Sequence, residues 1–265
     1  MPPCKGAVEK EVTGLGLRIF GATDRGMARS VNEDRFAGAV LAPDFGYGLV
    51  CDGVGGAKAG DVASTVARDE IRRGLEAACR PGIDQRSVGL MMESAISTAN
   101  SLVYHRASQD PALLGGMGTT LCLAVVYDGG RVCIANVGDS RGYLLRGGEL
   151  RQLTTDHTRA QLLFDRGEIT ARELERHPDR NRLTRAIGVE PAVEADYSEL
   201  RLEPGDTLLL CSDGLYNMMD PVTLRECLRQ SLTQGDAQCL IDAANAMGGR
   251  DNITAVIITL EDENG

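Results

Sequence analysis

Two glycine-marked turns separate strand-like segments of this chain and constrain its fold more than any other feature. An Asp-Gly-Gly turn at 128–130 joins apolar runs at 119–127 and 131–137, and Gly147-Gly148 follows a run at 141–146. Turns this short join antiparallel neighbours, because their backbone twist matches that of the strands on either side. A sheet wound only from parallel strands and helical crossovers is therefore disfavoured.

The remaining periodic segments divide into strands and helices. Runs rich in β-branched and other apolar residues predict further strands at 15–23, 46–51, 207–211 and 253–260. Apolar residues recur near helical spacing at 61–79, 87–108, 221–230 and 236–247. Long helices mixed with hairpin-linked strands indicate an α+β fold built in layers. The polar, arginine-rich stretch 156–188 has short helical pieces and is expected to leave the sheet as a lid.

Size and composition favour a single globular domain. The chain has 265 residues, of which 43% are hydrophobic and 25% are charged, and this is enough to bury a sizeable core. It contains no internal repeat, low-complexity tract or linker rich in proline and serine. We expect a flexible N-terminal tail at 1–13, one domain at 14–261 and a short tail at 262–265.

Charge and cysteine usage exclude several classes of function. The formal charge of −10 disfavours a nucleic-acid partner, which needs clustered basic residues to neutralise phosphates. No apolar run approaches the roughly 20 residues that cross a bilayer, and residues 1–14 are charged where a secretory signal would be apolar. The eight cysteines are spread singly, without zinc spacing. We expect a cytoplasmic protein with reduced thiols and no membrane partner.

Acidic residues recur where predicted strands end. Three aspartates directly follow apolar runs and a fourth precedes the last run, and an adjacent acidic pair stands before another expected strand: Asp52, Asp139, Asp213, Asp251, Glu33 and Asp34. One aspartate beside a glycine is usually only a turn residue. Carboxylates gathered at strand ends without matching cations repel one another, and a divalent cation would relieve that repulsion. Oxygen ligands without histidine or cysteine favour magnesium, manganese or calcium over zinc.

These residues fall in motifs that resemble a known family, the metal-dependent serine/threonine protein phosphatases of the PPM or type 2C family, and its bacterial members in particular. The motifs occur in the family's order and span nearly the whole chain: Arg29 with Asn32-Glu33-Asp34, 52–56 (DGVGG), 115–120 (GGMGTT), 137–141 (VGDSR), 212–215 (SDGL) and 251–254 (DNIT). The resemblance implies a central antiparallel β-sandwich flanked by α-helices on both faces. It also implies that 156–188 is a flap beside the site.

The resemblance assigns a role to each acidic motif residue. Asp52 would bridge two Mn²⁺ or Mg²⁺ ions, Asp213 and Asp251 would complete one ion, and the Gly53 carbonyl would bind the other. The remaining acidic residues would act around these ions: Glu33 and Asp34 on metal-bound waters, and Asp139 with Asp213 on a weaker third ion. A shared water with a lowered pKa would then attack phosphorus in line.

Arg29 matches the family's phosphate clamp, since its planar fork can donate two parallel hydrogen bonds to phosphate oxygens. Val54 stands where many eukaryotic relatives have a histidine that can protonate the leaving group, and valine cannot donate a proton. His157 and His177, at or in the flap, are therefore candidate contacts for the leaving group. A metal-bound water is the favoured proton donor.

The implied function is hydrolysis of phosphoserine and phosphothreonine in proteins, with a cognate serine/threonine kinase supplying the substrates and the enzyme acting as a monomer. The alternative is a catalytically silent regulator of the same fold that binds phosphoproteins. Two other motifs point to different functions, and each is incomplete. Residues 138–142 formally match the G-x-S-x-G elbow of serine hydrolases, but a strand follows where a helix is required. The glycine-rich segment 53–60 lacks the Gly-Lys-Ser/Thr ending of a phosphate-binding loop.

Overall fold

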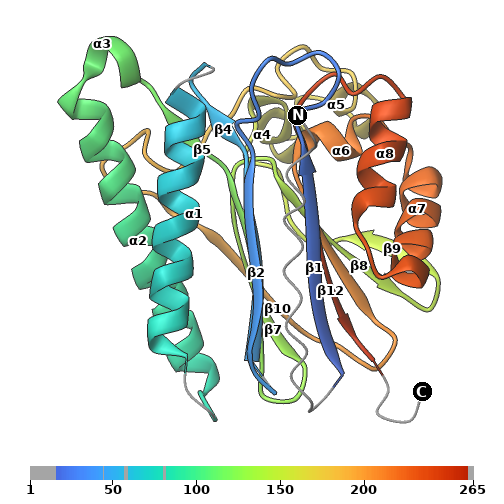
Figure 1. The fold of residues 1–265 in the computed structure, drawn as a ribbon. Coiled ribbons are helices and arrows are strands. Elements are labelled where there is room, and N and C mark those ends of the chain that lie inside the picture. The colour runs from blue at the N-terminus through green and yellow to red at the C-terminus, as the bar shows by residue number, and fades with distance from the viewer. Residues whose placement is uncertain (1–15, 44, 57–58, 80–81, 262–265) are drawn as a thin grey trace.

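Two antiparallel sheets pack face to face and are covered on both sides by helices (Figure 1). The computed structural model describes residues 16–43, 45–56, 59–79 and 82–261, so the expected tails at 1–13 and 262–265 lie outside the described residues. The predicted α+β sandwich with helices on both faces is confirmed. No helix in these described ranges is long and apolar enough to cross a bilayer.

The first sheet joins the two ends of the described chain. Its strand order is β1-β12-β11-β8-β9, formed by Leu17–Asp24, Ile253–Leu260, Thr207–Cys211, Arg141–Arg146 and Glu149–Gln152. All neighbours are antiparallel. The β8–β9 hairpin turns at Gly147-Gly148, where both glycines have positive φ, as the sequence predicts.

The second sheet has the order β10-β7-β6-β3-β2, formed by Asp196–Arg201, Arg131–Val137, Leu121–Tyr127, Phe45–Cys51 and Arg35–Ala42. Its neighbours are also antiparallel. A two-stranded piece, β4 (Gly53–Val54) paired with β5 (Gly118–Thr119), continues beyond it. The single strand predicted at 119–127 is therefore split at Thr120, whose backbone N–H donates to the Asp52 carbonyl.

Side-chain alternation along the strands builds three apolar layers. In β6, Leu121, Leu123 and Val125 face the helices, whereas Cys122 and Ala124 face the other sheet. The same two-residue period in β11 sends Leu208 and Leu210 between the sheets, and Leu209 and Cys211 toward the opposite helices. Strands buried on both faces explain why these segments read as almost continuous apolar runs.

Two long helices cover the second sheet and two shorter ones cover the first (Figure 1). The first pair is α1 (Ala59–Ala78) with α2 (Gln85–Gln109), and the second is α7 (Pro221–Gln234) with α8 (Gln238–Ala246). The Asp220 side chain caps the start of α7, and Gly235 ends that helix in the left-handed conformation. The sequence predicts all four helices to within a few residues.

The short helices lie near one end of the sandwich (Figure 1). They are α3 (Pro111–Leu114), α4 (Arg159–Asp165), α5 (Ala171–Leu174) and α6 (Asp213–Tyr216). The short helical pieces expected within 156–188 are α4 and α5. The edge strand β10 was not predicted, because its sequence DYSELR is polar and half-exposed.

Candidate active site

An acidic cleft of about 350 Å³ opens at the end of the sandwich that carries β4. Its charged lining residues come from widely separated parts of the chain: Arg29, Glu33, Asp52, Asp139, Asp213 and Asp251. Gly53 and Val54 also line it. The structure thus brings together Arg29, Gly53 and all the predicted acidic residues except Asp34, which is buried and not part of the lining.

Strand pairing places these carboxylates at one edge. Asp213 follows β11 and begins α6, and Asp251 precedes β12, which pairs with β11. A Cβ atom at Gly214 would lie 1.9 Å from the Asn252 carbonyl oxygen, so only glycine allows the two loops to approach this closely. Asp52 follows β3, a strand of the facing sheet, and precedes β4.

The electrostatics of the cleft are those of crowded, uncompensated carboxylates. Burial raises the pKa values of Asp52 and Asp213 well above the usual aspartate range, and neighbouring carboxylates raise them further. Burial likewise raises the pKa of Asp139 to about 7, with Asp156 adding to the effect. Such a site favours either protons or cations.

Arg29 is the one cation among the described residues that line the cleft. Its Nη2 atom lies 2.7 Å from Asp251 Oδ2, and this hydrogen bond is the main reason that the pKa of Arg29 is raised. Half of the Arg29 side chain is exposed. Arg29, which the sequence predicts to bind phosphate, therefore lies at the cleft and is paired with Asp251, a predicted metal ligand.

Asp34 is fully buried at the centre of a hydroxyl network. Ser212 Oγ and Thr254 Oγ1 donate to Asp34 Oδ2 over 2.6 and 2.7 Å. A hydroxyl has one proton to donate, so Thr23, whose Oγ1 lies 2.7 Å from Thr254 Oγ1, must donate to it. Asn32 Nδ2 in turn donates to Thr23. Sequence motifs contain Ser212 and Thr254, but only the structure reveals this shared role.

Two acidic oxygens remain without a partner among the described residues. Asp34 Oδ1 and Glu33 Oε1 are both buried and accept no hydrogen bond. Burial raises the pKa of Asp34 to about 6 and also raises that of Glu33. A buried unpaired carboxylate oxygen is costly. Glu33 lines the cleft, so its free oxygen is suited to a ligand there, whereas Asp34 lies behind the lining, beside Asp52.

The donor set fits hard divalent cations. It consists of carboxylate oxygens and the Gly53 carbonyl, with no histidine or cysteine among the described lining residues. Among the described residues, no group of three or more histidine, cysteine, aspartate or glutamate side chains is already arranged to hold a metal ion. Asp251, for example, is turned toward Arg29. The agreement between this cleft and a hard divalent cation therefore rests on the type of donor atoms and on the unpartnered carboxylate oxygens.

Neither flap histidine lines the cleft. His157 is buried; its Nδ1 accepts from the Gly138 N–H at 3.2 Å, and its Nε2 lies 3.2 Å from Asp196 Oδ2. Burial lowers the pKa of His157. His177 Nδ1 accepts from the Asp179 N–H. In this arrangement both rings serve local structure, and the cleft carries Val54 in place of a side-chain acid.

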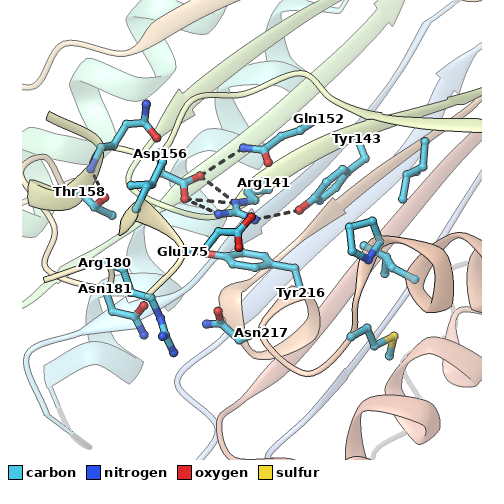
Figure 2. A pocket seen from close by; sticks show the side chains of 16 residues that line it. Arg141, Tyr143, Gln152, Asp156, Thr158, Glu175, Arg180, Asn181, Tyr216 and Asn217 are labelled. Carbon is cyan, nitrogen blue, oxygen red and sulfur yellow. Dashed lines mark hydrogen bonds and ion pairs between the residues drawn. The ribbon is translucent and has the colours of Figure 1, made fainter. Parts of the chain in front are cut away.

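Arg141, which follows Asp139 in its motif, anchors the neighbouring flap pocket, a hollow of about 560 Å³ between the flap and β8 (Figure 2). Its guanidinium group lies 3.7 Å from the centre of the Tyr216 ring, and its Nε and Nη2 donate to Asp156. The Tyr216 hydroxyl donates to the Asp139 carbonyl. Arg141 therefore connects the start of the flap to the backbone at Asp139, a role that its motif alone did not reveal.

The rival hydrolase motif is not an elbow. Ser140 is fully buried, and its Oγ lies 2.7 Å from Thr120 Oγ1. Strand β8 begins at the next residue, Arg141, so no helix follows the turn. The rival phosphate-loop reading rests on Lys58, which lies outside the described residues.

Solved structures that match this fold include bacterial serine/threonine phosphatases. The structure of PstP/Ppp from Mycobacterium tuberculosis is 36% identical, covers 93% of this chain and 99% of its own, and superposes with a TM-score of 0.81. Stp1 from Staphylococcus aureus is 33% identical, covers 96% of this chain and 100% of its own, and has a TM-score of 0.84. The PstP catalytic domain in complex with two manganese ions is 34% identical, covers 93% of this chain and 99% of its own, and has a TM-score of 0.79. Fold and acidic cleft together define a metal-dependent phosphatase.

The sequence comparisons agree with the structural ones. Residues 26–240 match the family described as protein phosphatase 2C. The serine/threonine phosphatase stp of Listeria monocytogenes is 39% identical over 239 residues, which is 89% of this chain and 93% of the relative. The chain belongs to the protein phosphatase 2C family, as its motifs predict.

Proposed function

We propose that this chain hydrolyses phosphoserine and phosphothreonine in proteins with the help of two divalent cations. The observation that carries the proposal is that one cleft is lined by four aspartates: Asp52, Asp139, Asp213 and Asp251. Among the described residues that line this cleft, only Arg29 is positively charged. Burial, and then repulsion by neighbouring carboxylates, raises the pKa values of Asp52 and Asp213. Bound cations would supply positive charge and a nucleophile at neutral pH.

The chain's own residues divide the remaining work. We assign Asp52 as the bridging ligand, Asp213 and Asp251 as ligands of one ion, and the Gly53 carbonyl as a ligand of the other. Glu33 and Asp34 would act on the surrounding waters through their unpartnered oxygens. Asp139, with Asp213, would hold a weaker third ion.

Arg29 would orient the phosphoryl group. Its guanidinium lies at the cleft, half-exposed, and can leave Asp251 to donate two parallel hydrogen bonds to phosphate oxygens. A bidentate arginine fixes direction as well as charge. Val54 contributes an apolar wall and no proton.

The experiment is hydrolysis of a phosphothreonine peptide with Mn²⁺ or Mg²⁺, with and without EDTA, by the wild-type chain and by Asp52→Asn. We expect wild-type turnover that EDTA abolishes, and a loss of several orders of magnitude in Asp52→Asn because the nucleophile depends on both ions. Near-normal turnover in Asp52→Asn with unchanged metal content would refute the assignment. A wild-type chain that binds the peptide and Mn²⁺ without turnover would instead favour the silent phosphoprotein-binding regulator.

The physiological setting stays a prediction. We propose a cytoplasmic monomer that opposes a serine/threonine kinase. Relatives named serine/threonine phosphatases support the opposition to such a kinase. A phosphoproteome comparison between a deletion strain and its parent would test it, since hyperphosphorylated sites should share that kinase.

A further inference from the structure

A third hollow, of about 340 Å³, lies next to the acidic cleft. The two share Val54 and Leu183 as wall residues, and the rest of this flanking hollow is built from residues of the segment 184–194. A substrate chain lying in the cleft can therefore enter the flanking hollow without leaving the protein surface. Neither the metal site nor the phosphate clamp uses it.

The walls of the flanking hollow are mostly aliphatic. Val54, Leu183, Ala186, Val189 and Val193 line it, and Val189 keeps 44% of its surface exposed. Apolar surface of this kind, at the edge of a functional cleft, is suited to the aliphatic part of a ligand.

The charged side chains of the flanking hollow differ in whether they already have an ion-pair partner. Arg185 is already paired, with Nη1 2.5 Å from Asp196 Oδ1. The carboxylates of Glu190 and Glu194 have no hydrogen-bond or ion-pair partner in the described part of the chain. The hollow therefore offers two free negative charges beside an apolar wall.

The segment that carries Glu190 is firmly anchored. Buried Asn100, from α2, accepts from the Gly188 N–H at 2.7 Å and donates to the Glu190 and Pro191 carbonyls at 3.1 and 3.2 Å. Ile187 exchanges two backbone hydrogen bonds with Thr119 of β5, the partner strand of β4. The flanking hollow is thus preformed and fixed relative to Gly53 and Val54.

We propose that the flanking hollow binds a lysine or arginine side chain of the phosphoprotein substrate, within about three residues of the phosphoresidue. Such a side chain has an aliphatic stem for the valine and leucine walls and a cationic head for Glu190 and Glu194. An extended chain advances about 3.3–3.6 Å per residue, so near neighbours of the phosphoresidue can reach a hollow that shares two walls with the cleft. The inference rests on the proposed function and names the substrate class that the site prefers.

The test is a charge scan of phosphothreonine peptides. One arginine is moved through the three positions on each side of the phosphoresidue in an otherwise alanine background, and kcat/KM is measured with Mn²⁺. The enzymes are wild type, Glu190→Lys, Glu194→Lys and the double variant. Glu226→Lys on α7 makes the same charge change outside the hollow and is the matched control. Hydrolysis of p-nitrophenyl phosphate, which has no flanking residues, reports the basal chemistry.

We expect one arginine position to raise wild-type kcat/KM by about two- to fivefold over alanine, the range of an exposed ion pair. The double variant should lose this preference and favour glutamate at that position, while Glu226→Lys and all p-nitrophenyl phosphate rates stay close to wild type. No preference at any position, or a preference that survives in the double variant, overturns the inference and leaves the phosphatase assignment standing. Absence of wild-type turnover on peptide and p-nitrophenyl phosphate alike overturns both.

Discussion

Arg29 and Asp251, which are 222 residues apart in the chain, form an ion pair with Nη2 2.7 Å from Oδ2. The same carboxylate is the one we assign to a metal ion, and the same guanidinium is the one we assign to phosphate. With these assignments, we expect Arg29 to compete with the cation for Asp251 and to be released when it binds a phosphoryl group.

Removing the competitor should tighten metal binding. In Arg29→Ala, Asp251 is free and one repelling charge is gone, so we expect the Kd for Mn²⁺ to fall by about two- to fivefold, the scale of a partly exposed ion pair. Isothermal titration calorimetry at low phosphate measures it. Arg25→Ala, which removes a nearby exposed arginine outside the cleft, is the control. Equal or weaker Mn²⁺ binding in Arg29→Ala would contradict the competition.

Arg29→Lys should separate charge from geometry. Lysine keeps the positive charge but cannot donate the two parallel hydrogen bonds of a guanidinium group. We expect kcat/KM for a phosphopeptide to fall by an amount worth about 1–3 kcal/mol, the scale of a charge-assisted hydrogen bond. Unchanged kinetics in both Arg29→Lys and Arg29→Ala would make Arg29 an ordinary surface residue.

The raised pKa values predict how the metal-free protein responds to pH. Asp34 and Asp139 titrate near 3.8 when unfolded, whereas burial raises their folded pKa values to about 6 and about 7. Between about pH 4 and 7 the folded state thus binds more protons, so the free energy of unfolding falls as pH rises. Buried His157, with a lowered pKa, acts in the opposite direction but is a single group.

Thermal unfolding in EDTA measures this effect. We expect Tm at pH 7.5 to lie below Tm at pH 5 by at least about 2–4 °C, the shift produced by about 1 kcal/mol in a domain of this size. Asp139→Asn should flatten the dependence, and saturating Mn²⁺ should reverse it because the metal binds deprotonated ligands. A Tm that rises with pH in EDTA, equally in wild type and Asp139→Asn, would show that these carboxyl groups are not protonated in the folded state.

The hydroxyl network around Asp34 predicts a long-range role for Thr254. Thr254→Val removes one of two donors to Asp34 Oδ2 and leaves the Thr23 hydroxyl without its acceptor. Because such donors orient Asp34, which we assign to the metal-bound waters, we expect Mn²⁺ affinity to fall by about 10- to 100-fold at pH 6.5 and to recover partly at pH 8.5. Isothermal titration calorimetry measures the Mn²⁺ affinity at both pH values. Thr254→Ser retains the hydroxyl and should restore binding; if it does not, the methyl group and not the hydrogen bond matters.

The positions of His157 and His177 predict that neither histidine protonates the leaving group. Side-chain acid catalysis is typically worth about 10²–10⁴ in rate, and a serine alkoxide needs it far more than p-nitrophenolate does. Since neither ring lines the cleft, His157→Ala and His177→Ala should change phosphoserine peptide and p-nitrophenyl phosphate rates in parallel. Using the ratio of the two rates cancels any loss of folded protein. A selective loss of about tenfold or more on the peptide would identify that histidine as the acid.

The regular elements of this protein could be predicted from its sequence because they are local. Strands β7, β8, β11 and β12 begin and end at the predicted residues, since runs of β-branched and aliphatic residues bounded by glycine turns suit strands buried on both faces. Edge strand β10 could not be predicted, because its polar residues gain their conformation from pairing with β7. Its stability comes from partner residues 60 to 70 positions away in the chain.

The chemistry was likewise determined by the sequence, through carboxylates at strand ends and the order of their motifs. Which of those groups meet was decided only by the tertiary structure. Packing of the two sheets places Arg29 on Asp251, buries Asp34 under Ser212 and Thr254, and turns His157 away from the cleft toward Gly138 and Asp196. Hydrogen bonds form only at donor–acceptor distances of about 3 Å, and charge interactions weaken as the distance grows. Residue type and order therefore indicate what a group can do, whereas only the folded chain determines which groups come close enough to do it.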